Sequence, residues 1–188
     1  MITAYIDFKS LDCFLAISPI LELADDCETP VSWQPYRSKE RARPTQVANE
    51  SVTQTHHRVR AASERRLQLH YARLRGLDID PSRGQIDTSA ALRWLASLEG
   101  DTSSFVSRLF TAHWIDRTDI NDPTFLQELT TQCGLRRTGD AVDLRSIERK
   151  AEEKGLFDAP TFFIEGQMFT GRAHIPLMRQ LLADGGDR

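Results

Sequence analysis

The order of apolar and polar residues at the start of the chain predicts a strand followed directly by a helix. From Thr3 to Phe8 the side chains alternate as they do in a buried strand. The segment from Ser10 to Cys13 then opens a run with apolar residues at helical spacing, namely Phe14, Ile17, Leu21 and Ala24. Ser10 therefore stands where the first helix begins, a position that favours serine as a cap.

The last third of the chain predicts a helix end, a short hairpin and a final helix. Gly155 ends a helix, the β-favouring residues 161–164 follow, and Glu165-Gly166 supplies a turn. The final helix runs from about residue 175 to residue 182. Pro160, just before the hairpin, is either an ordinary loop proline or a cis-proline, since the cis form costs only about 0.5–1 kcal/mol.

Between these ends the pattern is helical after one further strand, at Val31–Pro35. A long helix is expected over residues 51–75, and Asp-Pro and Arg-Gly signals break it between residues 76 and 84. Three caps and one apolar repeat predict further helices: Asp87–Ser89, Asp101–Ser104, Asp122-Pro123, and the spacing of Leu144, Ile147 and Ala151. The chain shows no internal repeat.

These elements and their order resemble the DsbA-like thioredoxin superfamily, in particular the branch of 2-hydroxychromene-2-carboxylate isomerase and kappa-class glutathione transferase. In that superfamily the first helix opens with Cys-x-x-Cys in the oxidoreductases and with Ser-Pro-x-Ser in the isomerase branch. Here the motif is Ser10-Leu11-Asp12-Cys13. Ser10 matches the isomerase branch, Cys13 matches the oxidoreductases, and Leu11 replaces the proline. The similarity continues through Leu109–Trp114, Asp119-Ile120, Leu126, Gly134-Leu135, Glu152–Leu156 and Ala159–Phe162.

The resemblance implies an α/β class, thioredoxin-like fold with an all-α helical insertion. Residues 1–36 and 155–188 would form a discontinuous thioredoxin-like domain, and residues 37–154 would form an α-helical insertion domain. Pro160 would be the cis-proline of the fold, in a loop against the start of the first helix. Since relatives are commonly dimers, a homodimer is expected.

The resemblance also implies a glutathione site. Ser10 would donate a hydrogen bond to the thiolate of bound glutathione, at a helix end where unpaired N–H groups and the macrodipole favour an anion. The backbone at Ala159-Pro160 would pair with the cysteinyl part of glutathione. Relatives contact the γ-glutamyl group through Gly-x-Asp-Arg, where this chain has Gly171, Arg172, Ala173 and His174. The missing acid predicts weak binding.

Cys13 has two interpretations. It is either a buried structural residue on the inner face of the helix or a resolving thiol that exchanges with a glutathione mixed disulfide. Ser10 by itself is a poor nucleophile, because no base lies near it in the sequence. Ser10 and Cys13 are the candidate catalytic residues, and no metal site is expected.

Composition agrees with a compact enzyme of 188 residues, with 40% hydrophobic and 27% charged residues. No apolar run is long enough to span a bilayer, and the first residues lack the basic region of a signal peptide. Three cysteines are a sparse, odd set that fits a reducing compartment, so we expect a cytoplasmic protein. A pI of about 6.0 argues against nucleic-acid binding.

Positive charge gathers between residues 37 and 75, which contain ten Lys or Arg against three acids. In the family this part of the insertion covers the active site, so the charge is suited to attract anionic glutathione or an aromatic carboxylate. The alternative is a solvated helix face without a specific role.

The expected function is that of a glutathione-dependent isomerase acting on a small aromatic or conjugated carboxylate. Two alternatives stay open at this point. One is a cytoplasmic DsbA-like thiol-disulfide oxidoreductase that uses Cys13, and the other is a non-catalytic thioredoxin-fold binding module.

Overall fold

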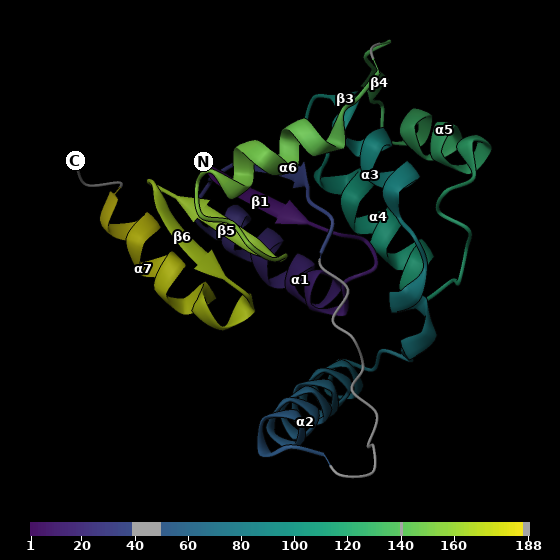
Figure 1. Ribbon diagram of the computed structural model, residues 1–188. Helices are drawn as coiled ribbons and strands as arrows, with labels where there is room; N and C mark the ends of the chain where they lie inside the picture. Colours follow the sequence, from purple (N-terminus) through teal and green to yellow (C-terminus); the bar gives the residue numbers. More distant parts are fainter. Residues whose placement is uncertain (39–49, 140, 186–188) are drawn as a thin grey trace. The chain divides into compact units, whose positions relative to one another are not determined.

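The computed structural model describes residues 1–38, 50–139 and 141–185 and contains a four-stranded mixed sheet (Figure 1). The strand order is β2-β1-β5-β6. Strands β1 (Ile2–Ile6) and β2 (Val31–Pro35) pair in parallel, and β5 (Thr161–Ile164) is antiparallel to β1. Strand β6 (Gln167–Thr170) completes the predicted hairpin.

Local sequence explains two features of this sheet. Glu165 and Gly166 both have positive φ, of 50° and 80°, which suits the two-residue turn of a hairpin. Strand β1 ends at Ile6, two residues before the predicted end at Phe8. The reason is Asp7, whose carboxylate accepts a hydrogen bond from the backbone of Lys9 and turns the chain out of the sheet.

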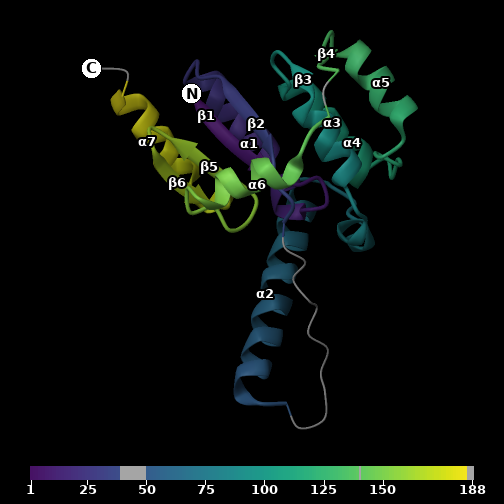
Figure 2. The same cartoon turned by 45° about the horizontal axis from the view of Figure 1, so that its top comes forward.

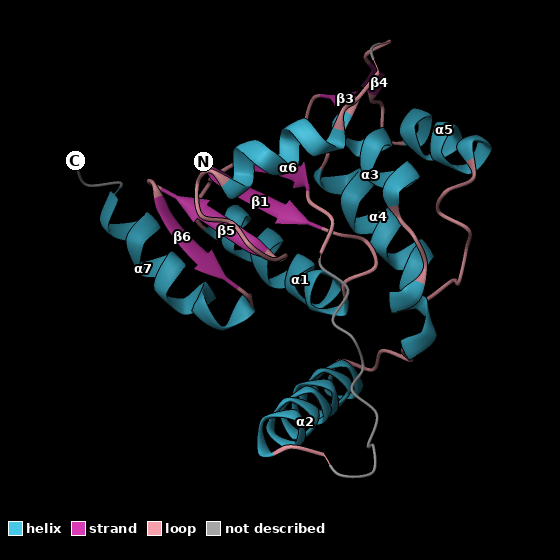
Figure 3. Cartoon of the chain, viewed as in Figure 1, coloured by secondary structure: helices cyan, strands magenta, loops and turns pink. Residues whose placement is uncertain are grey.

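Helices cover both faces of the sheet (Figures 1 and 3). Helices α1 (Leu11–Asp26) and α7 (Ile175–Gly185) contact each other on one face, and α6 (Leu144–Glu152) lies on the other, against β2. Glu148 of α6 accepts two hydrogen bonds from the Arg37 guanidinium, at 2.6 and 2.7 Å. This buried carboxylate ties α6 to the end of β2.

A second group of helices lies beside the sheet (Figure 2). They are η1 (Pro81–Gln85), α3 (Ser89–Ala96), α4 (Ser103–Trp114) and α5 (Pro123–Gln132), with a two-strand ladder of β3 (Leu98–Glu99) and β4 (Arg136–Arg137). Helix α5 begins as predicted, with Asp122 as cap and Pro123 in the first turn. The short ladder is the one departure from an all-helical insertion among the described residues.

Aromatic packing joins α4 to α1 and to the loop that follows β1. Phe110 lies 4.9 Å from Phe8 and 6.1 Å from Phe14, measured between ring centroids. Trp114 is fully buried and donates from Nε1 to the Phe8 carbonyl oxygen at 2.9 Å. Helix α4 therefore supports the segment that leads into α1.

The chain divides into two compact units, residues 1–38 with 80–188, and residues 39–79. Residues 80–154 of the predicted insertion thus group with the sheet. In the smaller unit, α2 (Val52–Leu74) starts with a capping box in which Ser51 and Gln54 bond reciprocally. Four charged residues of the predicted basic segment, Lys39, Glu40, Arg41 and Arg43, lie outside the described residues. None of the described helices combines the length and apolar character needed to cross a membrane.

His113 is a buried histidine whose partners define its charge. Its Nδ1 lies 3.2 Å from a guanidinium nitrogen of Arg83, and its Nε2 lies 3.1 Å from the Arg83 carbonyl oxygen. Because a guanidinium offers only donors, Nδ1 accepts, Nε2 donates, and the ring is neutral. Burial, with the nearby positive charge of Arg83, lowers the pKa of His113 to about 4.

This pKa predicts a loss of stability in mild acid. The unfolded chain takes up a proton at this histidine as the pH falls through about 6.5, whereas the folded chain resists until about pH 4. The free energy of unfolding should fall by about 2 kcal/mol between pH 7.5 and pH 5, measured by urea titration. His113→Gln should remove this dependence. The control His70→Gln should keep the slope, and a slope that persists in His113→Gln would contradict the assignment.

Candidate functional site

Ser10 caps the N-terminus of α1, as the sequence predicts. Its backbone is extended, with φ −82° and ψ 116°, and its Oγ accepts a hydrogen bond from the Cys13 backbone N–H at 3.3 Å. The hydroxyl hydrogen is not used in that bond and can be donated to a ligand. The first N–H groups of a helix lack intrahelical partners and carry the positive end of the macrodipole. The helix start therefore suits an anion.

Asp7 holds the turn that leads to Ser10. The residue is fully buried, and its carboxylate accepts hydrogen bonds from the Thr88 hydroxyl at 2.6 Å and from the backbone and hydroxyl of Ser38, both at 2.7 Å. Its carbonyl oxygen accepts from the Ser10 N–H at 3.0 Å. The start of α1 is thus fastened to the end of β2 and to the start of α3.

Cys13 is fully buried on the inner face of α1. Its sulfur accepts a hydrogen bond from the Asp7 backbone N–H at 3.4 Å. Burial raises the pKa of the Cys13 thiol well above its usual value, so the sulfur carries its proton at neutral pH. Since the thiolate is the nucleophilic form, this environment favours the structural role of Cys13.

The loop before β5 lies beside the end of β1. The Ala159-Pro160 peptide bond is cis, one of the two forms considered for Pro160. Thr161 pairs with Tyr5 of β1, which places Pro160 next to the residues that lead toward Ser10. The Pro160 carbonyl accepts from the Gly171 N–H at 2.8 Å. The segment that begins at Gly171 is therefore held against the proline loop.

The backbone of Ala159 is only partly available to a ligand. Its N–H donates to the carboxylate of Asp158 at 2.9 Å. No hydrogen bond within the described ranges uses its carbonyl oxygen. The Ala159 carbonyl oxygen can accept a hydrogen bond from the cysteinyl part of glutathione as it stands. The Ala159 N–H can pair with that part only after its hydrogen bond to Asp158 is broken.

Arg172 brings the C-terminal segment to the start of α1. It lies in η2 (Arg172–His174), and its guanidinium is 3.3 Å from the Asp12 carboxylate. Ala173 is exposed, and so is His174, whose ring packs near Phe169 with centroids 6.2 Å apart. Contacts thus connect the Ser10 motif, the proline loop, Gly171 and Arg172, whereas the His174 ring packs against β6.

Sequence reasoning missed Asp7 and the role of Asp12. An acid between Ile6 and Phe8 in an apolar segment was a signal for Asp7, because a buried carboxylate needs several donors. The Asp12–Arg172 pair joins residues 160 positions apart. No local sequence pattern predicts a pair of residues so far apart in the chain.

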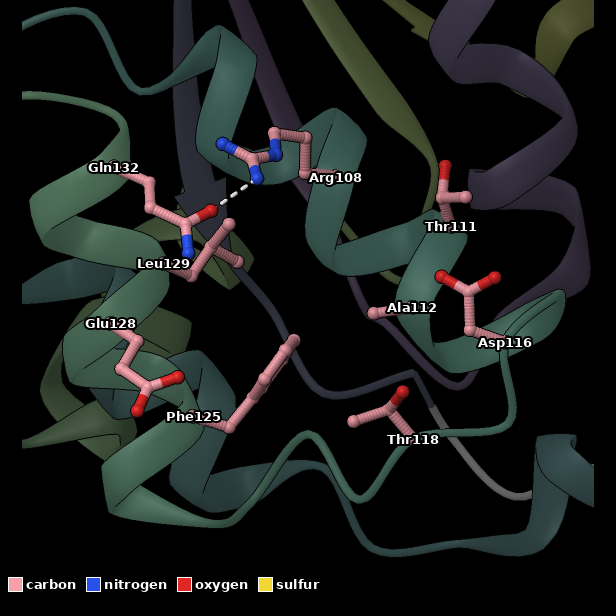
Figure 4. A pocket seen from close by; sticks show the side chains of 9 residues that line it. All are labelled: Arg108, Thr111, Ala112, Asp116, Thr118, Phe125, Glu128, Leu129 and Gln132. Carbon is pink, nitrogen blue, oxygen red and sulfur yellow. Dashed lines mark hydrogen bonds between the residues drawn. The ribbon is translucent and has the colours of Figure 1, made fainter.

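A separate hollow of about 250 Å³ lies between α4 and α5 (Figure 4). Phe125 points into it, Asp116 and Glu128 stand at its sides, and Arg108 donates to Gln132 at its edge. None of the predicted site residues lines it. Among the described residues, no group of three or more His, Cys, Asp or Glu is arranged to hold a metal ion.

Comparison with solved structures supports the fold. The chain is similar to 2-hydroxychromene-2-carboxylate isomerase, with a TM-score of 0.68, 16% identity, and 97% of this chain and 94% of the other covered. It is similar to the cytosolic disulfide reductase DsbM from Pseudomonas aeruginosa, solved with GSH, with a TM-score of 0.58, 16% identity, and 100% and 99% covered. The chain is also similar to a putative protein disulfide isomerase from Nitrosomonas europaea, with a TM-score of 0.59 and 16% identity; 97% of this chain and 95% of the other are covered.

A comparison with curated protein sequences found no match. The family model of the DSBA-like thioredoxin domain matches residues 1–183. With the cis-proline loop, the sheet order and the helical layer, this match confirms the thioredoxin-like fold that the sequence predicted. The chain belongs to the DSBA-like thioredoxin domain family.

Proposed function

We propose that this protein is a glutathione-dependent enzyme of the isomerase type, acting on a small aromatic or conjugated carboxylate. The observation that carries the proposal is the contrast between two residues of one motif. Ser10 presents a hydroxyl at the positive end of α1, while the Cys13 thiol is buried and keeps its proton. The chain thus offers a place for a thiolate at the helix start but supplies none of its own there.

The residues present fit glutathione in part. Ser10 offers a donor for a thiolate, the Ala159 carbonyl offers a backbone acceptor, and Arg172 offers a positive charge for a carboxylate. The DsbM structure with GSH supports a glutathione site in this fold. Ala173 supplies no acid for the ligand's amino group, so we expect binding to be weak.

When bound, glutathione would supply a thiolate that adds reversibly to a conjugated double bond. The chain's own residues would stabilise and orient the reactants. Ser10 would hold the sulfur by donating its hydroxyl hydrogen, and the N–H groups of the first turn would lower the energy of negative charge there. Arg172, with a side chain only 20% exposed, would place a carboxylate near the helix start while Asp12 orients the guanidinium.

The cellular setting is part of the same proposal. Cys13, Cys27 and Cys133 are all unpaired. Unpaired cysteines and a glutathione requirement both suit the cytoplasm, where thiols stay reduced. A small-molecule substrate, with neither nucleic acid nor membrane as a partner, completes the proposal.

A thiol-disulfide oxidoreductase is the second candidate, favoured by the similarity to a cytosolic disulfide reductase. It would require Cys13 to act as a thiolate, which its burial opposes. The third candidate is a non-catalytic binding module. It would show neither activity, and calorimetry would detect no glutathione binding.

Ser10→Ala should reduce glutathione-dependent isomerisation of 2-hydroxychromene-2-carboxylate by one to a few factors of ten. The reason is the loss of one donor to a developing charge, worth about 3 kcal/mol. Initial rates at saturating glutathione measure the effect. Ser10→Gly is the matched control, because glycine preserves most of the cap energy but has no hydroxyl. Equal rates in wild type and Ser10→Gly would remove the hydroxyl from the mechanism.

Ala173→Asp should tighten glutathione binding by about ten- to a hundredfold, because a charge-assisted hydrogen bond contributes about 1.5–3 kcal/mol. Titration calorimetry at low salt gives the affinity. Ala90→Asp adds the same charge to an exposed position on α3 and should change nothing. Tight binding by wild type, or no gain in Ala173→Asp, would mean that the ligand lies elsewhere.

Ser10→Cys tests the oxidoreductase alternative, because it restores the Cys-x-x-Cys motif. The new thiol would lie at the exposed, dipole-activated position, so we expect it to form a disulfide with Cys13 and to reduce insulin. Wild type should be inactive in this assay. Ser10→Cys combined with Cys13→Ala should lose the gain. Insulin reduction by wild type would favour the oxidoreductase instead.

A further inference from the structure

The hollow between α4 and α5 is a second concave site, formed entirely within the larger unit of the chain (Figure 4). Its volume of about 250 Å³ is just below the usual range of ligand sites, so it suits a small molecule. The half-buried ring of Phe125 and the buried side chains of Leu129 and Ala112 supply its apolar part. The hollow therefore offers an apolar surface to a ligand.

Hydrogen bonds within the chain fix the wall of the hollow that follows α4. The Asp116 N–H donates to the Thr111 carbonyl oxygen at 3.1 Å. The Thr118 N–H donates to the Ala112 carbonyl oxygen at 2.9 Å. The Thr118 carbonyl oxygen in turn accepts from the Arg83 guanidinium at 2.6 Å. Since the chain already holds this loop in place, a ligand does not have to order it on binding.

Two carboxylates on opposite walls give the hollow its charge. Asp116 follows α4, Glu128 lies on α5, and both are exposed. In the ranges that the structure describes, neither carboxylate takes part in a hydrogen bond or an ion pair. The guanidinium of Arg108 also lines the hollow, but it donates to Gln132 at the edge. With two carboxylates against one guanidinium, the lining is negative and attracts a cation.

From this lining we infer that the hollow binds an aliphatic diamine. One ammonium group pairs with Asp116 and the other with Glu128, while the methylene groups between them cover the apolar surface. An ammonium group near the Phe125 ring also gains from the negative face of the ring. The diamine thus matches the sign of the charge, the separation of the two carboxylates onto opposite walls and the apolar surface between them.

A divalent metal ion matches the hollow less well. Calcium and magnesium ions require six or more oxygen ligands, of which two carboxylates on opposite walls supply few. Within the described part of the chain, no group of three or more His, Cys, Asp or Glu is placed to hold a metal ion. An organic cation with two charged ends needs only one carboxylate at each end.

Binding in the hollow is expected to be weak. Ion pairs with exposed carboxylates contribute little and are screened by salt. We therefore expect a dissociation constant of roughly 0.1–1 mM for 1,4-diaminobutane at low ionic strength. The inference concerns a site separate from Ser10 and does not depend on the proposed function.

Titration of the full chain with 1,4-diaminobutane, followed by NMR of the backbone amides, tests the inference. The shifts should saturate and should be largest at lining residues such as Thr111, Thr118 and Leu129. The amine 1-aminobutane lacks one ammonium group and should bind about two- to fivefold more weakly. Succinate, which carries two negative charges, should not bind. Shifts that do not saturate, or that centre on another surface, would overturn the inference.

Charge variants test the two proposed ion pairs. Asp116→Asn and Glu128→Gln should each weaken diamine binding by about two- to fivefold, because each removes one exposed pair. Arg108→Gln should tighten binding by about twofold, since it removes a repulsive charge, and a loss of folding would not produce a gain. Glu153→Gln is the matched control, because it removes the same charge at the exposed residue that follows α6.

Two results would contradict the diamine assignment. Equal weakening in Glu153→Gln and Glu128→Gln would show a general attraction of cations to the protein surface. Magnesium chloride that produces the same saturating shifts at the same concentration would assign the hollow to a metal ion instead. Circular dichroism should show unchanged helix content in every variant.

Discussion

The buried carboxylate of Asp7 joins parts of the chain that are far apart in sequence. It accepts from Ser38 at the end of β2 and from Thr88 at the start of α3, which is 81 residues away. A buried carboxylate is costly unless its oxygens are hydrogen-bonded. The donors are Lys9 in the same turn and the distant residues Ser38 and Thr88, so the carboxylate is satisfied only when these segments meet. The turn before Ser10 takes its shape from that requirement.

The contacts of Asp7 fix the position of the start of α1, where Ser10 lies. The same residue that accepts from Ser10 through its carbonyl also donates from its N–H to the sulfur of Cys13. Phe8 and Trp114 close the other side of this turn. Such packing keeps water from Cys13 and leaves Ser10 partly exposed at the helix end. Ser10 and Cys13 therefore differ in access to solvent, so that the Ser10 hydroxyl can meet a ligand while the Cys13 thiol is shielded.

The second half of the site depends on the hairpin. The Gly171 N–H bonds to the Pro160 carbonyl, and Arg172 then reaches Asp12 on α1. The N-terminal end of α1, the proline loop and one arginine are thereby connected by short contacts. This arrangement agrees with the DSBA-like thioredoxin fold, whereas Leu11 and Ala173 depart from the sequence pattern of the isomerase branch.

The sequence by itself determined the order of the elements, the cap at Ser10, the hairpin turn and the family. The first three depend on local rules, namely hydrophobic period, capping chemistry and the turn preference of glycine, whereas the family follows from the resemblance of the motifs and their order. Tertiary structure alone decided the burial of Cys13, the donors around Asp7 and the Asp12–Arg172 pair. Cysteine at the fourth position of the motif suits either a structural or a resolving role until the packing around it is known. The physical reason is that solvation and pKa depend on neighbours supplied by distant segments, which no local pattern specifies.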